Sequence, residues 1–262
     1  MIITRRGTIL TIPLAFAALP AQSETPKPTV RHVIAALRGP HPVDLSGWDL
    51  SRLDLADLDI TGANLAGSNL FGADLTDAKL VGCNLAGATL DRAIIIRADF
   101  TGANLAGASV MLPAAFSQPG LSPSEDAPRF RQANLSGARI LAKLGSGDWT
   151  GANLTGAHLE LGRLQFLAAL HSDFSGCKLT GAILAGAVLA GVKLAFADLR
   201  QADLSGADLR GADLSGARLD GASLAGAQLA RSDMQRASLR EVRGLDQADG
   251  VQEIRNLEYA DR

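Results

Sequence analysis

The sequence predicts an all-β protein whose chain coils as a solenoid. A large apolar residue recurs every five residues over most of Leu45 to Leu239, a small residue stands two places before it, and glycine often stands two places after it. Five residues turn an α-helix by about 500° and reverse the face of a continuous strand, so neither element buries this pattern. A chain that turns a corner once per repeat does bury it, and glycine suits the corner.

The N-terminal residues 1–23 predict an export signal. Arg5 and Arg6 precede an uncharged apolar run over 7–19, and small residues follow where a signal peptidase cleaves. A helix of that length spans about 20 Å, short of the roughly 30 Å hydrocarbon core of a bilayer. We therefore expect a cleaved signal, of the Sec or the twin-arginine type, and a periplasmic or secreted protein without a transmembrane anchor. The alternative is a buried N-terminal helix of the mature protein.

Both ends of a solenoid expose unpaired backbone and need caps. Residues 24–42 are expected to form a linker and then an N-terminal capping helix, because apolar residues recur at helical spacing over 29–38. Residues 240–262 leave the five-residue period. We expect them to form a C-terminal cap, with a dimerisation helix as a further possibility.

The repeat itself resembles a known family. Its clearest copies read Ala202-Asp203-Leu204 and Ala63-Asn64-Leu65, followed by two residues that end in glycine. Over residues 43–239 the chain resembles the pentapeptide-repeat proteins. The resemblance implies a right-handed quadrilateral parallel β-helix with four repeats in each coil and short helical caps. At that ratio the repeats make about nine coils, stacked at the spacing of parallel strands.

The apolar column is the predicted core. Inward leucines alternate with outward polar residues, and most of those polar residues are Asp or Asn. We read the exposed acids as ordinary solvating residues of a regular rod. The residues taken to represent the core are Leu65, Leu85, Leu105, Leu199, Leu204, Leu209 and Leu214.

Residues 111–129 interrupt the repeats with four prolines, which remove donors from the ladder and predict a projecting loop. The loop is either a tolerated surface insertion or a partner-binding segment. The resemblance implies that such a loop can be functional, because some family members that protect type II topoisomerases carry loops that matter for that protection. Its candidate contact residues are Pro113, Pro119, Pro123, Glu125 and Asp126. After a one-residue slip in the period, residues 145–170 are also irregular, and we expect a local bulge there.

The sequence contains few residues in patterns typical of catalytic, metal-binding or cofactor sites. No histidine pairs with another at a metal-binding spacing on a helix face, and no cysteine lies near one. Cys83 and Cys177 stand in the small inward column, several coils apart, so we expect buried thiols and no disulfide. We find no nucleophile with a base and no phosphate-binding loop. The sequence therefore predicts no enzyme, no cofactor and no metal site.

Two classes of function remain. The first is an exported, non-catalytic rod that contacts an unidentified protein partner or serves a structural role, with a possible homodimer through the C-terminal end, as the resemblance implies. The alternative is a DNA-mimicking, gyrase-binding protein of the quinolone-resistance type. No binding of nucleic acid is expected in either case.

Charge separates these two classes. The chain has 25 basic and 27 acidic residues, and 23 basic residues remain without Arg5 and Arg6. This balance is weak for a mimic of DNA, which carries one charge per roughly 1.7 Å. Residues 20 apart should stack, and Asp59, Lys79 and Asp99 then alternate in sign, as do Lys178, Asp198 and Arg218, and Asp173, Lys193 and Asp213. Local exceptions are Asp54 above Asp74 and the ring of Asp198, Asp203, Asp208 and Asp213.

Overall fold

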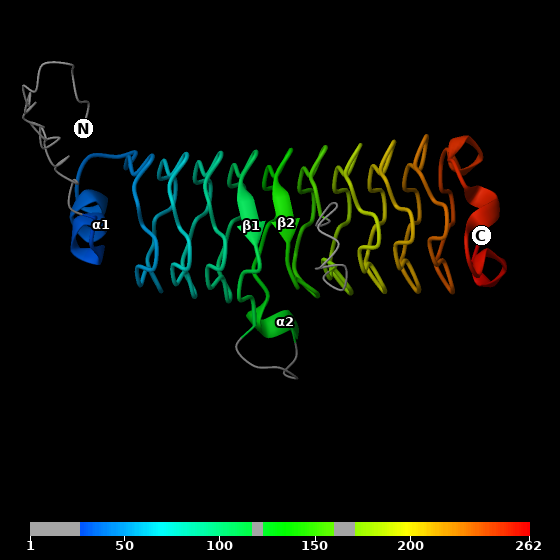
Figure 1. The fold of residues 1–262 in the computed structure, drawn as a ribbon, viewed down its shortest axis with the longest axis horizontal. Coiled ribbons are helices and arrows are strands. Elements are labelled where there is room, and N and C mark those ends of the chain that lie inside the picture. The colour runs from blue at the N-terminus through cyan, green and yellow to red at the C-terminus, as the bar shows by residue number, and fades with distance from the viewer. Residues whose placement is uncertain (1–26, 117–122, 160–170) are drawn as a thin grey trace, which may run out of the picture.

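The structure, a computed structural model, describes residues 27–116, 123–159 and 171–262. These residues form a rod of stacked coils, with the helix α1 at one end and the C-terminus at the other (Figure 1). The export signal predicted over residues 1–23 lies outside the described residues. Within the described residues no helix combines the length and the apolar character that crossing a bilayer requires.

Successive coils are joined by parallel backbone bridges, and outside the middle of the rod and the last coil the bridged residues are 20 apart. Four such columns of bridges run along the rod, five residues apart in each coil, so each coil has four sides. The first bridges of the four columns are Asp44–Asn64, Asp49–Asn69, Asp54–Asp74 and Asp59–Lys79. The same bridges stack the residues that the sequence placed in common columns, including Asp59–Lys79–Asp99 and Lys178–Asp198–Arg218.

Each corner is a tight turn held by the repeat's own residues. At one corner the Ser68 N–H donates to the Leu65 carbonyl at 3.0 Å, and Gly67 has a φ of +64°. A type II turn requires positive φ at this third position, which glycine adopts without strain. The Asn64 side-chain oxygen accepts the Ala66 N–H at 3.2 Å. The outward Asp or Asn is therefore a corner residue, a role that our reading as a solvating residue missed.

Regular strands are short because a corner follows every five residues. Among the described residues the only pairing longer than a single bridge joins β1 (Ser109–Met111) to β2 (Arg139–Leu141). These two strands run parallel, with Val110 opposite Ile140. The rest of the ladder consists of one bridged residue on each side of each coil.

The core is a narrow column of apolar side chains inside the coils. The seven leucines chosen from the sequence each have 0% of their surface exposed, and alanines fill the second inward position. In the middle of the rod the core changes to aromatic rings. Phe100 stacks on Phe130 with ring centroids 4.8 Å apart, Phe130 stacks on Trp149 at 4.1 Å, and Phe174 lies 5.1 Å from Trp149.

The two ends differ in structure. The α-helix α1 (Val30–Leu37) buries Val33 against the first coil. At the other end, three 3-10 helices, η2 (Leu245–Gln247), η3 (Val251–Glu253) and η4 (Leu257–Tyr259), stand where we considered a single dimerisation helix. The bridge ladder continues through this segment. Its bridged residues are six apart and consist of Arg243, Asp249, Arg255 and Asp261.

Candidate interaction site

Before the last coil, the spacing between bridged residues differs from 20 only in the middle of the rod. The Asn104–Asn134 bridge spans 30 residues, Asn134–Asn153 spans 19, and Asn153–Ile183 spans 30. The first long coil contains the loop predicted over 111–129. The second carries ten extra residues between the bridged residues His158 and Asp173. The bulge that we expected over 145–170 is therefore wrong, and residues 160–170 of that range lie outside the described residues.

The two insertions flank the same side of the rod. The loop leaves the rod after Ala114, and the ladder resumes at Arg129 on the next side of the coil. Ala114 belongs to the side that Lys143 and Asp173 occupy in the following coils. The second insertion enters that same side from its other edge. Between them lies a side of only four residues, where Leu141, Ala142 and Leu144 are all buried. Three irregular features therefore meet on one face.

The base of the loop is fixed to the rod. Ala115 is buried and Phe116 packs against the core where the loop leaves, and the chain returns through the helix α2 (Pro123–Asp126), which projects from the rod (Figure 1). The Asp126 carbonyl accepts the Arg97 N–H at 2.8 Å, so the returning chain takes a place in the backbone ladder. Residues 117–122 lie outside the described residues.

Arg97 also joins two carboxylates at this base. Its Nε and Nη2 donate to the two oxygens of Asp77 at 2.7 and 2.6 Å, and its Nη1 donates to Asp126 at 2.9 Å. Hydrogen bonds from Arg97 are the main reason why the pKa of Asp77 lies below its ordinary value. Asp126 is only 9% exposed. We call this group of Asp77, Arg97 and Asp126 the loop clamp.

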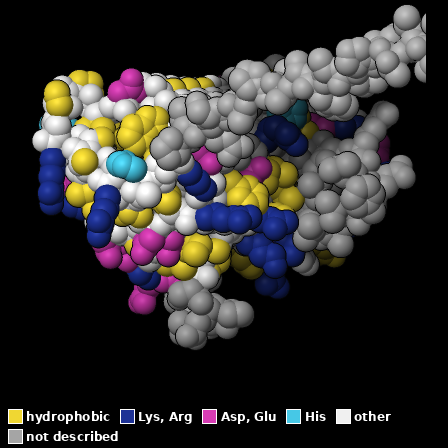
Figure 2. Space-filling view, turned by 60° about the vertical axis from the view of Figure 1, so that its left-hand side comes forward, with side chains coloured by type: hydrophobic (Ala, Val, Ile, Leu, Met, Phe, Trp, Pro, Cys, Tyr) yellow, Lys and Arg dark blue, Asp and Glu magenta, His cyan; other side chains and the backbone are white. Residues whose placement is uncertain are grey.

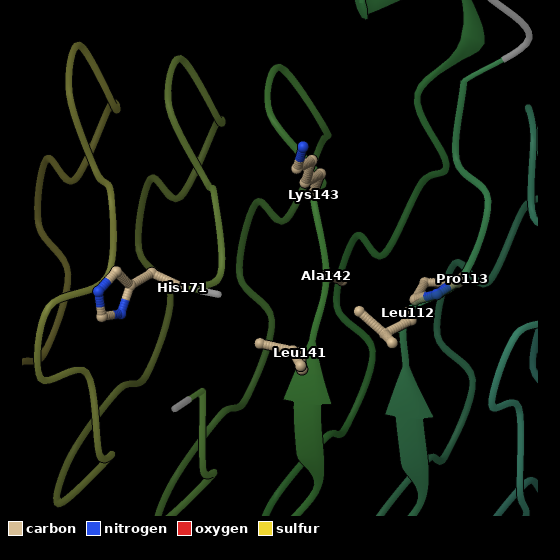
Figure 3. Close-up of a pocket in the computed structure, with 6 residues that line it drawn as sticks. All are labelled: Leu112, Pro113, Leu141, Ala142, Lys143 and His171. Carbon is tan, nitrogen blue, oxygen red and sulfur yellow. The ribbon is translucent and has the colours of Figure 1, made fainter. Parts of the chain in front are cut away.

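A small cleft opens beside the four-residue side; six residues that line it are shown in Figure 3. Its volume is about 160 Å³, and its walls are mostly apolar. Leu112 and Leu141 are neighbours in the ladder, since the Leu112 N–H donates to the Leu141 carbonyl at 2.7 Å. We call this feature the mid-rod cleft, lined by Leu112, Pro113, Leu141, Ala142, Lys143 and His171.

The residues proposed from the sequence for the loop fall into different roles. Pro113 lines the mid-rod cleft, and Glu125 is exposed on α2. Asp126 belongs to the clamp, so it anchors the loop instead of facing solvent. Pro119 lies outside the described residues, and Pro123 begins α2. The sequence missed Leu112, Leu141 and His171, because only the ladder brings these distant residues together.

The charged columns neutralise themselves along the rod. One column alternates in sign over its first eight members, and we call it the alternating column. Its ladder neighbours Lys79 and Asp59 lie 3.4 Å apart, and Arg129 and Asp99 lie 3.5 Å apart. Basic and acidic side chains also lie side by side on the face seen in Figure 2. The column consists of Asp59, Lys79, Asp99, Arg129, Asp148, Lys178, Asp198, Arg218, Ser238 and Asp261.

The ring of four aspartates, which the sequence marked as an exception, is partly neutralised as well. Arg200 and Arg210 lie two residues beyond Asp198 and Asp208 and hydrogen-bond to both oxygens of each carboxylate. These bonds lower the pKa of Asp198 and of Asp208 below the ordinary value. The ring therefore does not present four free negative charges.

The two cysteine thiols of the chain are enclosed in the core. Both cysteine thiols are buried and free, and burial raises the pKa of Cys83 to about 11 and that of Cys177 to about 12. Neither thiol is a nucleophile at neutral pH. In the part of the chain that the structure describes, no group of three or more His, Cys, Asp or Glu side chains is arranged to hold a metal ion.

These features define a class of protein: a four-sided parallel β-solenoid with an irregular middle. A sequence profile of pentapeptide repeats matches the chain in eight copies, over residues 43–77, 68–107, 172–211 and 207–243. This match covers just over half of the chain, and the chain belongs to the pentapeptide-repeat family. Membership implies a right-handed β-helix. No curated protein matches the chain in sequence.

Several solved structures are similar to the chain. HetL, a pentapeptide repeat protein involved in heterocyst differentiation regulation in the cyanobacterium Nostoc sp., is 26% identical, with 86% of this chain and 96% of HetL covered and a TM-score of 0.41. A trypsin-treated form of QnrB1, a plasmid-mediated fluoroquinolone resistance protein, is 17% identical, with 83% and 88% covered and a TM-score of 0.49. A protein of the Arabidopsis thaliana thylakoid lumen is 26% identical, with 48% and 72% covered and a TM-score of 0.21.

Proposed function

We propose that the chain is an exported, non-catalytic interaction rod that binds a protein partner through its middle. The observation that carries this proposal is the convergence of both insertions and the four-residue side on one face. A regular solenoid is stabilised coil by coil, so extra segments add nothing that its stability needs. Inserted loops on a rigid scaffold are where binding residues concentrate.

The loop clamp supports this proposal. A tolerated surface insertion does not need an anchor, yet Arg97 binds Asp126 through both its backbone and its side chain. An anchored base holds the projecting segment in a fixed direction, which lowers the entropy lost when a partner binds. The family in general is made of structural and interaction proteins, which agrees with a non-catalytic role.

Site-specific photo-crosslinking in the producing cells tests this proposal. A photoreactive residue at the exposed Glu125 should give discrete crosslinked products, while one at the exposed corner residue Gln201 should give none. Equal crosslinking at both positions would exclude a binding site in the middle of the rod.

We also propose that residues 1–23 direct export and are then removed. Fractionation of the producing cells should place the mature protein outside the cytoplasm, with an N-terminus near Glu24. Replacement of Arg5 and Arg6 by Lys should block export only if the twin-arginine route is used. An intact Met1 on a cytoplasmic protein would contradict export and would favour the gyrase-binding alternative, because gyrase is cytoplasmic.

The ends of the rod carry a separate proposal. We propose that α1 and residues 240–262 cap the stack of about nine coils, and that the C-terminal end also forms a homodimer. Leu245, Val251, Ile254 and Leu257 pack against the core but remain partly exposed at that end. Sedimentation should show a dimer for the whole chain and a monomer for Ile254→Asp. A monomeric whole chain would rule the dimer out.

A further inference from the structure

Leu112 occupies a position where a leucine is costly. It has a φ of +53°, in the left-handed region; at the same corner of other coils stand Gly72 and Gly191, with φ of +63° and +68°, and the charged Arg52 and Arg92, with φ of +60° and +58°, so Leu112 is the apolar side chain among these residues. A side chain in this region is strained, because its Cβ lies too close to a backbone carbonyl oxygen, whereas glycine has no Cβ and avoids this strain. Leu112 is also 48% exposed, so the solenoid gains little burial in return. A strained and exposed apolar residue points to a role in binding.

The space beside Leu112 has the size of one side chain. The mid-rod cleft measures about 160 Å³. A cavity of about 150 Å³ with apolar walls is large enough to take up benzene. Leu112 and Leu141 both point into this region, and Pro113 continues the wall (Figure 3). The cleft therefore fits one aromatic ring.

The polar groups that line the cleft are basic. Lys143 and His171 are exposed and belong to its lining. Within the described residues Lys143 forms no ion pair, although Asp173 follows it in the ladder. The His171 ring lies over Gly191, with two ring atoms 3.2 Å from the position of a Cβ there, so the missing side chain of Gly191 makes room for it. The ring of His171 is thus turned toward Gly191, and the exposed ammonium of Lys143 is the group that favours a carboxylate in the cleft.

We propose that the mid-rod cleft binds an aromatic side chain of the partner together with a carboxylate next to it. The two halves of this recognition come from separate residues, with Leu112 and Leu141 contacting the ring and Lys143 pairing with the acid. This inference rests on the proposed function, since it names the chemistry that the middle of the rod recognises.

Ligand-observed NMR and calorimetry with 3-phenylpropionate, a small probe that carries both groups, test the inference on the purified protein. The probe should bind in a saturable way, and Lys143→Gln should weaken it by up to about fivefold, because one exposed charge contributes up to about 1 kcal/mol. Leu112→Gln should weaken it similarly. Lys193→Gln is the matched control, since Lys193 lies in the same column outside the cleft. The neutral 3-phenylpropanamide should bind the wild type as weakly as the acid binds Lys143→Gln.

Four results would overturn the inference. The first is no binding of the acid, and the second is equal binding to the wild type and to Lys143→Gln. The third is equal affinity for acid and amide. The fourth is binding only to a variant without residues 160–170, which would make the cleft a docking site for this chain's own segment. Crosslinking at Glu125 does not depend on the probe. It therefore tests the proposed function separately, and each of these four results would leave that proposal standing.

Discussion

At the scale of the residue, each repeat divides its positions between core, corner and surface. Leu204 is fully buried, while the neighbouring Asp203 points outward and accepts the Ser205 N–H at 3.0 Å. An Asn side chain offers the same acceptor oxygen, so the corner tolerates it. The identity of the inward residue matters for stability, whereas the outward residue needs only a suitable oxygen.

Leu204→Asp should therefore lower the free energy of unfolding by several kcal/mol, because it buries a charge in a narrow apolar column. Asp203→Asn should change it by less than about 0.5 kcal/mol, since the corner bond survives. Chemical denaturation of both variants measures the difference. Similar shifts for the two would show that the inward and outward assignments are mistaken.

A second prediction at this scale concerns the last coil. A Cβ on Gly250 would lie 2.7 Å from the Ala230 backbone nitrogen, whereas a Cβ on Gly226 would meet nothing within 4 Å. Both residues have positive φ, +72° and +68°. Gly250→Ala should lower the melting temperature more than Gly226→Ala, because only the former adds a clash with backbone to the cost of the left-handed conformation. Equal losses would mean that the last coil does not pack so closely against the preceding one.

At the scale of the element, the loop clamp decides how α2 is held. Arg97→Gln should lower the free energy of unfolding by about 1–2 kcal/mol, since the pair with Asp77 is partly exposed while Asp126 is nearly buried. It should also speed proteolytic cleavage within residues 111–129. Arg92→Gln is the matched control, because Arg92 is also an arginine with positive φ but lies over Phe71. Unchanged cleavage in Arg97→Gln would argue against an anchored loop.

The clamp should also respond to acid in a defined direction. The pKa of Asp77 in the folded protein lies below its ordinary value of 3.8, so its ion pair stabilises the fold above that pH. This contribution is lost as the pH falls through the lowered pKa. The difference in unfolding free energy between the wild type and Arg97→Gln should therefore be constant near neutral pH and shrink below about pH 4. A difference that persists in full at pH 2 would contradict this assignment.

At the scale of the whole molecule, the sequence predicts the regular parts well and the middle poorly. A step of 20 residues follows from the five-residue repeat together with the four repeats per coil that the family resemblance implies, and it placed Asp59, Lys79 and Asp99 in one column. The second insertion escaped detection for a physical reason: it adds ten residues, which is twice the repeat length, so the period continues through it unchanged. The mid-rod cleft escaped too, because it depends on which residues the insertions bring together.

The structure extends the predicted alternation across both insertions. Two separate stretches of alternating charge were predicted from the sequence, and the ladder joins them through Arg129 and Asp148, which lie 30 and 49 residues beyond Asp99. Opposite charges then follow one another at about the 4.8 Å spacing of neighbouring strands. At a distance of one Debye length, about 10 Å at 0.1 M salt, such a column presents little net field. A continuous anionic stripe, which a mimic of DNA needs, is absent from this column.

We therefore predict that the purified protein neither inhibits the supercoiling activity of gyrase nor protects gyrase from quinolones. The matched variants replace the four cations of the column, Lys79, Arg129, Lys178 and Arg218, by Gln in one protein and four of its acids, Asp59, Asp99, Asp148 and Asp198, by Asn in another. Only the first variant leaves negative charges in succession, so only it should gain binding to a cationic polymer that strengthens as salt is lowered. Asn keeps the corner acceptor in the second variant, which should therefore stay folded and show no such gain. Protection of gyrase by the unaltered protein at micromolar concentration would contradict the proposed function as an interaction rod and would establish the gyrase-binding alternative. It would show that a column of alternating charges is compatible with mimicry of DNA.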